Sequence, residues 1–169
     1  MLVAAGSRAQ AQRVSDARSS SPEPSFGQTI SVSPLFALLG FYTADIERRV
    51  ISTATLGVGG SAFSLGPFGY KSVDLKARYY PGGRALEGIG LGVSAGMIRL
   101  SADEGGIFSG PASGSGFVVG TDVTHTKIHG KLVLSVGGGV KHILRYGGYD
   151  VSGIHLTYPT ARASVGLAF

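Results

Sequence analysis

The side chains that could support acid–base or metal chemistry are few in this chain of 169 residues. It has no cysteine, which excludes thiolate metal sites and cysteine catalysis. Its four histidines are His125, His129, His142 and His155. His125 and His129 have a spacing that would pair two metal ligands on a helix. On a strand that spacing spans roughly 13 Å, too far to share one zinc ion. We therefore expect no metal and no cofactor.

A second group of residues has the types needed for a nucleophilic hydrolase. His155 precedes Thr157, and Asp150 and Ser152 lie just before them. Such a site needs a base within hydrogen-bonding reach of a hydroxyl, and an acid that orients the base. The nearby hydroxyl belongs to a threonine, and no serine lies at a matching spacing. We therefore expect no catalytic residues here, and we interpret His155 and Asp150 as solvated side chains.

The elements that would position these groups are strands. Apolar and polar residues alternate, as in Val73 and Leu75 against Asp74 and Lys76, and this is the period of a strand with two different faces. The clearest such segments are residues 73–80, 89–97, 132–141 and 161–169, with weaker ones at 53–63 and 117–126 and a further strand that ends near Glu47. Turn-forming glycines and prolines separate them. The alternation predicts an all-β antiparallel fold.

Composition narrows the class of β protein. Glycine accounts for 28 residues, and only 15% of residues are charged, against about 25% in an ordinary soluble domain. The net charge is +5, but the basic residues are scattered singly, so we expect no nucleic-acid partner. No apolar run approaches the ~18 residues of a membrane-spanning helix. If the chain crosses a membrane, it must do so as a closed barrel.

The polar face of the predicted strands carries four acids and four bases. By parity, one face holds Asp45, Glu47, Asp74, Lys76, Arg78, Asp122, Lys141 and Arg162, among glycine, serine and threonine. Small residues suit the inside of an eight-stranded barrel, which has room only for side chains. Unpaired buried charges would be costly, so the balance predicts a filled, cross-linked lumen. The alternative is that some of these side chains lie near the rims and are solvated.

The end of the chain carries a family resemblance. Residues 161–169 are apolar at every second position back from Phe169, through Leu167 and Val165. This pattern resembles the C-terminal assembly signal of Gram-negative outer-membrane proteins. With the strands at 73–80 and 89–97, residues 28–169 are similar to small OmpA-like and OmpW-like barrels. The resemblance implies recognition by the barrel-assembly machinery, outer-membrane localisation, and contact with outer-membrane lipid and lipopolysaccharide as a monomer.

The resemblance also implies a topology. We expect an up-and-down transmembrane barrel of eight strands, with ten as the alternative. Seven strands are clear, and the eighth is expected within residues 27–38, where it would form a poorly defined hairpin with the strand that ends near Glu47. Stretches 66–71, 101–116 and 145–158 would face outward from the cell, and shorter turns at 49–52, 81–87 and 127–131 would face inward. Tryptophan is absent, so tyrosines such as Tyr42, Tyr79, Tyr80 and Tyr146 would have to form the aromatic girdles.

The N-terminus is expected to precede the barrel domain. Residues 1–11 combine an apolar start with the small-x-small sequence Ala9–Gln10–Ala11, which is typical of a truncated signal peptide. Residues 12–26 have no apolar period and are expected to form a flexible leader. The barrel domain would then occupy residues 27–169.

These patterns favour a structural or interaction barrel without catalysis. One alternative is a narrow channel or carrier for small apolar molecules, which apolar side chains in the outer half of the lumen would favour. A lipid A deacylase-like enzyme would need a nucleophile near His155. A soluble calycin-like carrier would need the apolar face to line its cavity. Arg99 and Arg145 could pair with lipopolysaccharide phosphates or extend to the membrane boundary.

Overall fold

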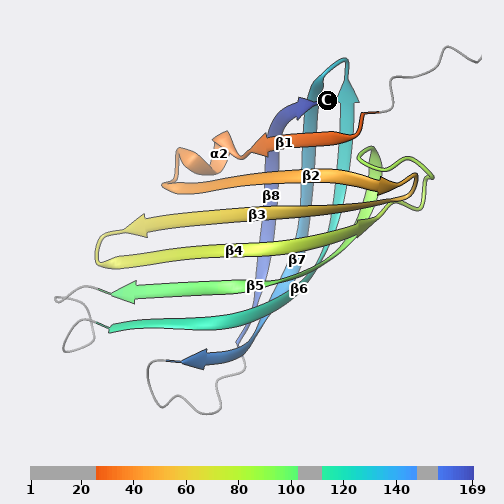
Figure 1. Ribbon diagram of the computed structural model, residues 1–169. Coiled ribbons are helices and arrows are strands. Elements are labelled where there is room, and N and C mark those ends of the chain that lie inside the picture. Colours follow the sequence, from red (N-terminus) through yellow and green to blue (C-terminus); the bar gives the residue numbers. More distant parts are fainter. Residues whose placement is uncertain (1–25, 103–111, 148–155) are drawn as a thin grey trace, which may run out of the picture.

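The chain forms a closed antiparallel β-barrel (Figure 1). The computed structural model describes residues 26–102, 112–147 and 156–169. The strands are β1 (Gln28–Val32), β2 (Phe41–Ile51), β3 (Ala54–Leu65), β4 (Phe68–Tyr79), β5 (Gly88–Ala102), β6 (Ala112–His129), β7 (Leu132–Gly147) and β8 (Thr157–Ala168). Each strand pairs with the next, and β1 pairs with β8 to close the barrel. The prediction of an all-β barrel with eight antiparallel strands is confirmed.

The first hairpin differs from a simple pair of strands. A short helix, α2 (Pro34–Ala37), lies between β1 and β2. Proline cannot donate a backbone hydrogen bond to a sheet but fits the first turn of a helix, so β1 stops before Pro34. Gly40 then adopts a φ of 80°, a left-handed conformation that returns the chain to β2. The strand expected to end near Glu47 continues to Ile51, with an irregular register between Arg49 and Ile51.

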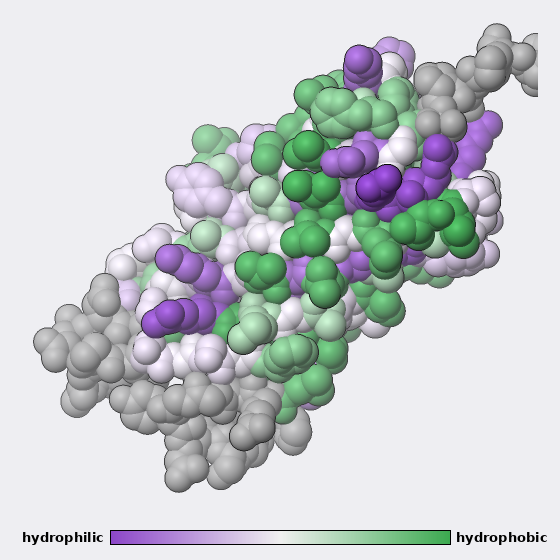
Figure 2. Space-filling model, in the orientation of Figure 1, coloured by the Kyte–Doolittle hydropathy of each residue, from purple (hydrophilic) through white to green (hydrophobic). Residues whose placement is uncertain are grey.

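The two faces of the barrel wall have opposite character. On β4, Val73 and Leu75 are 61% and 66% exposed, whereas Ser72 and Asp74 are 5% and 2% exposed. Along the other strands the same alternation puts most large apolar side chains outside. Ile98, Val118 and Ile143 are exceptions, because they are buried and pack together inside with Tyr70 and Tyr158. Figure 2 shows hydrophobic side chains gathered over the middle of one face, with most hydrophilic ones toward its ends. The barrel therefore has an apolar outer belt and an interior that contains buried polar and charged side chains.

The barrel has two different ends. At the terminus end, Phe169 accepts a hydrogen bond from the Gly27 amide (2.7 Å) and donates one to the Gln28 carbonyl (2.9 Å). At the opposite end, here called the loop end, lie α2 and the turn between β3 and β4. Several strands extend further toward the loop end than expected: β5 reaches Ala102 and β6 begins at Ala112. No helix in the described part of the chain is long and apolar enough to cross a membrane. The expected signal remnant and most of the leader lie outside the described residues.

Candidate functional site

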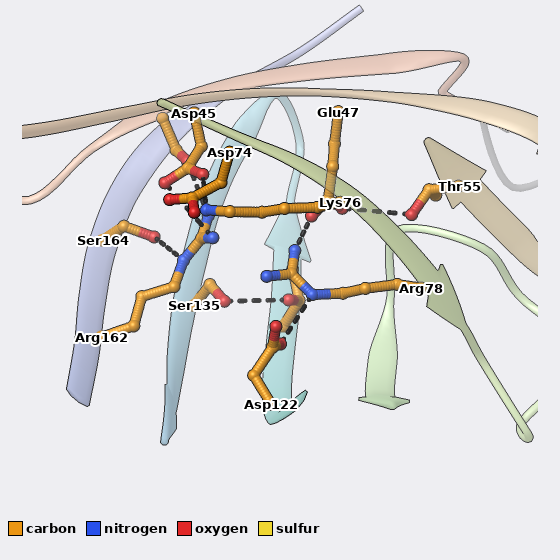
Figure 3. A network of polar contacts seen from close by, with 12 residues as sticks. Asp45, Glu47, Thr55, Asp74, Lys76, Arg78, Asp122, Ser135, Arg162 and Ser164 are labelled. Carbon is orange, nitrogen blue, oxygen red and sulfur yellow. Dashed lines mark hydrogen bonds and ion pairs between the residues drawn. The ribbon is translucent and has the colours of Figure 1, made fainter. Parts of the chain in front are cut away.

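The structure places all eight predicted charged residues inside the barrel, where they form ion pairs (Figure 3). They come from five strands: β2 (Asp45, Glu47), β4 (Asp74, Lys76, Arg78), β6 (Asp122), β7 (Lys141) and β8 (Arg162). We call these eight residues the luminal charge network. Because residues of one strand pair with those of distant strands, the network connects opposite walls across the lumen.

The network has three centres. Asp45 pairs with Lys76 and, at 3.3 Å, with Arg162. Lys141 Nζ lies 2.6 Å from Asp74 Oδ2. These two centres are held at mid-height in the barrel and use two acids and three bases between them. Since every charged group has an opposite charge within reach, the desolvation cost of the buried ions is offset by their attraction.

Arg78 is the third centre. It pairs with Glu47 through Nη1 and with Asp122 through Nε at 2.9 Å. Its side chain is almost fully buried, and a planar guanidinium can serve two carboxylates at once because its donors are fixed in a fork. Glu47 Oε2 also accepts hydrogen bonds from Thr55 (3.4 Å) and Tyr80 (3.1 Å). This centre therefore has one acid in excess, and the other two centres together have one base in excess, so the network as a whole is balanced.

Glycines give the charged side chains room to meet. In the register of the sheet, Gly92 on β5 lies between Arg78 on β4 and Asp122 on β6. A methyl group at Gly92 would lie 2.7 Å from Asp122 Oδ2, closer than real carbon–oxygen contacts allow. The absence of a side chain on β5 thus lets Arg78 and Asp122 pair across an intervening strand.

Replacing Gly92 with alanine is expected to destabilise the barrel by about 1–3 kcal/mol, because the added methyl group must displace Asp122 from Arg78. The measurement is urea unfolding of the refolded protein in detergent. Gly82→Ala is the matched control, since a methyl group at Gly82 would meet nothing within 4 Å. Equal stabilities for the two variants would contradict the close packing described above.

The terminus end of the lumen is closed by the connection between β4 and β5. Tyr80 and Leu86 of this connection are almost completely buried. The connection is tied to the turn before β3 by hydrogen bonds from the Tyr80 amide to the Thr53 carbonyl (2.8 Å) and from the Ala85 amide to the Ser52 carbonyl (2.7 Å). Burial raises the pKa of Tyr80, so its hydroxyl stays protonated and donates to Glu47. The prediction that Tyr80 belongs to an aromatic girdle is therefore wrong, because its side chain is buried inside the barrel.

Two of the other three tyrosines expected in the girdles lie on the outer wall. Tyr42 and Tyr79 are exposed on the outer wall, as a girdle requires. The side chain of Tyr146 lies outside the described residues. Tyr80 follows Tyr79 directly, and alternation alone puts it on the luminal side, a signal that outweighs its aromatic character.

The loop-end half of the lumen contains a cavity of about 510 Å³, which we call the loop-end cavity. All residues of the luminal charge network except Glu47 line it and form its floor. Aromatic side chains line its upper part: Phe36, Phe41, Phe63, Tyr70 and Tyr158. The ring centroids of Phe41 and Phe63 are 5.2 Å apart, and those of Phe41 and Tyr70 are 5.9 Å apart. The sequence analysis did not predict this cluster. The signal was present, because Phe41 is an even number of residues from Asp45 on β2, and Tyr70 is an even number from Asp74 on β4, so alternation places both aromatic residues on the luminal face.

The two histidines considered as a metal pair lie on a strand of the barrel wall. His125 and His129 are exposed on the outer face of β6, and the described part of the chain contains no cluster of metal-ligating residues. Thr157 lies 2.7 Å from His142 Nδ1, a pairing across β7 and β8 that the sequence did not suggest. Asp150, Ser152 and His155 lie outside the described residues.

The predicted assembly-signal residues lie on β8 and at the chain end. Leu167 and Phe169 are exposed on the outer wall, and Val165 is partly buried. Leu167 and Val165 lie opposite Ile30 and Val32 of β1, so this segment forms half of the seam that closes the barrel. No protein-family model, curated protein or solved structure matches the chain. Functional assignment therefore depends on the residues and geometry described above.

Proposed function

We propose that this protein is a transmembrane β-barrel of a Gram-negative outer membrane, with a structural or interaction role and no catalysis. The observation that carries the proposal is the inverted distribution of polarity: apolar side chains cover the outer wall, and buried ion pairs cross the interior. A barrel in water would need the opposite distribution, because its charged residues would solvate the outer surface. In lipid, pairing of each strand with its neighbours in a closed barrel satisfies the backbone groups of the paired wall.

The ends of the apolar belt also suit a membrane. Lys71 and Arg99 lie opposite each other on β4 and β5, both exposed near the loop end. Lys127 and Lys131 are exposed near the terminus end. Basic side chains at these positions can reach the phosphates of outer-membrane lipid or lipopolysaccharide. Arg145, the other expected lipid contact, has a side chain outside the described residues.

The obstruction of the lumen below the loop-end cavity supports a structural or interaction role over conduction. Ion pairs cross the barrel at mid-height, and Tyr80 and Leu86 close the terminus end. Single-channel recordings of the refolded protein in planar lipid bilayers are therefore expected to show no stable open state. A steady conductance would favour the channel alternative instead.

Membrane insertion is tested by a heat-modifiability gel of the protein refolded into detergent or lipid. The unheated sample is expected to resist the detergent and to migrate differently from the boiled one. Deleting Phe169 is expected to reduce assembly in cells several-fold, since the resemblance makes it part of the assembly signal, whereas Phe117→Ala removes another exposed phenylalanine and should assemble normally. A protein that stays soluble without detergent and shows no gel shift would overturn the membrane proposal; the calycin-like alternative would still require an apolar cavity lining, whereas the apolar face here is on the outside.

A second candidate function is a carrier for small apolar molecules. The loop-end cavity favours it, because aromatic side chains line the half of the lumen that would face out of the cell. The closed terminus end opposes transport through the whole barrel. Conductance and ligand binding therefore separate the candidates: binding without conductance indicates a pocket rather than a pore.

A further inference from the structure

The loop-end cavity has the dimensions and lining of a small-molecule site. Its volume of about 510 Å³ falls within the roughly 300–1,000 Å³ typical of such sites. Its upper part is aromatic, and its floor is formed by charged groups that pair with one another. A ligand that fills it must therefore have an apolar body and a polar end.

Unpartnered polar atoms of residues that line the cavity indicate the chemistry of the polar end of the ligand. Asp74 is buried and lines the cavity; its Oδ2 pairs with Lys141, but its Oδ1 has no hydrogen-bond partner among the described residues. The Tyr158 hydroxyl, which lies near Tyr70, also lacks a partner of normal geometry there. A buried carboxylate oxygen without a donor is costly, so the site favours a ligand that donates a hydrogen bond.

The charge balance of the floor indicates that the ligand is uncharged. Four acids and four bases of the luminal charge network already compensate one another. A cationic or anionic ligand would add a buried charge with no counterpart, which is strongly unfavourable. An alcohol can donate to Asp74 without disturbing this balance.

The wall beside the cavity is incomplete as a sheet. β1 pairs with β8 only from Val165 to Ala168, although β8 begins at Thr157. The upper part of β8 therefore has no strand partner on the β1 side. Pro159 lies in this stretch; it pairs with Val140 of β7 on one side but has no strand partner on the β1 side, and a proline is tolerated at such an edge.

Helix α2 occupies the position where the missing strand would be. It contacts both β2 and β8, and Phe36 from this helix lines the cavity. In Figure 1, α2 lies at the loop end beside β2. None of its residues is buried, no side chain caps it, and the adjacent Leu38 and Leu39 are exposed on the outside. A single helical turn with so little burial is held less firmly than a paired strand.

We propose that the loop-end cavity binds an uncharged amphipathic alcohol, which enters sideways past α2. Its hydroxyl donates to Asp74 Oδ1, and its apolar body lies against Phe41, Phe63 and Tyr70. The sideways entry rests on the proposed membrane location, since the outer side of α2 would then face lipid. Binding in the cavity does not depend on it.

The test uses the protein refolded into lipid nanodiscs and four fluorescent probes that share one ring system: 2-naphthylmethanol, 2-methylnaphthalene, 2-naphthoate and 2-naphthylmethylammonium. Protein-dependent fluorescence anisotropy, with empty nanodiscs subtracted, reports saturable binding. The alcohol is expected to bind at least about tenfold more tightly than the methyl compound, which lacks the donor. The two charged probes should bind more weakly than the alcohol. Equal affinities for the alcohol and the methyl compound would overturn the assignment to Asp74.

Variants locate the site and the entrance. Phe63→Leu should weaken alcohol binding about five- to tenfold, whereas Phe117→Leu, on the exposed outer face of β6, should not change it. Phe36→Ala should increase the association rate, because it reduces the cover without altering the floor. An unchanged rate would contradict sideways entry, and unchanged affinity in Phe63→Leu would contradict the pocket.

The outcomes distinguish this inference from the proposed function. A protein that shows the heat-dependent gel shift but no saturable binding of the alcohol is a membrane barrel without the proposed site. A protein that binds the alcohol in water and needs no detergent has the site but is not a membrane barrel.

Discussion

Arg78→Met is expected to lower the free energy of unfolding by about 3–5 kcal/mol, because it leaves two buried carboxylates without their counter-ion. Glu47 and Asp122 both pair with this one guanidinium, and its side chain is almost fully buried. Methionine has about the length of the aliphatic part of arginine. The loss of stability therefore reflects the missing positive charge more than missing packing contacts. The measurement is urea unfolding of the barrel in detergent, followed by far-ultraviolet circular dichroism.

Two further variants make this result specific. The triple variant Glu47→Gln, Arg78→Met and Asp122→Asn removes the whole centre and should recover much of the lost stability, since no unpaired charge remains. Arg84→Met removes an exposed arginine that pairs with Glu87 at 3.7 Å and should change stability by less than about 1 kcal/mol. If the triple variant is no more stable than Arg78→Met, uncompensated charge is not the cause of the loss.

Leu75→Arg is expected to destabilise the barrel in lipid by about 2–4 kcal/mol, the cost of a cation at the middle of a bilayer. Leu75 is exposed on the outer wall of β4, midway between Lys71 and Tyr79. In water the same change at an exposed position would alter stability by no more than about 0.5 kcal/mol. Unfolding in phospholipid bilayers measures the difference directly.

Ser64→Arg provides the position control for this prediction. Ser64 is exposed on β3 near its loop end, beyond the level of Lys71 in the sheet register. Arginine there should cost about 0–1 kcal/mol, because it lies near the membrane interface. A Leu75→Arg variant as stable as Ser64→Arg would contradict the transmembrane proposal, even if the barrel itself remained folded.

Alternation along the sequence was sufficient to predict strands, because a period of two cannot form a helix with a consistent face. It marked seven strands; the eighth strand and the closed barrel were predicted from the resemblance, in which such barrels have an even number of strands. The same parity assigned Asp45, Asp74 and the other six charged residues to one face. Their balance of signs predicted a filled lumen, because buried charges must be compensated.

Other features were missed because their sequence signals are weak or conflict. The loop-end segments 98–102 and 112–116 are strands, yet the second is mainly glycine and serine, which have little apolar pattern to detect. Tyr80 has the side chain of a girdle residue, but its position in the strand alternation directs it into the barrel. Helix α2 is too short to show a helical period, and its Pro34 could equally have marked a turn.

The sequence by itself determined which residues share the inside of the barrel, since strand geometry directs alternate side chains to opposite faces. Only the tertiary structure decided which of them meet. Arg78 pairs with Glu47 and Asp122 because the register of the strands brings the three side chains together. Gly92, which has no side chain, leaves the space between Arg78 and Asp122 open. Likewise, the aromatic cavity and the gap covered by α2 depend on how far β1 extends along β8, which is a property of strand pairing that local sequence does not encode.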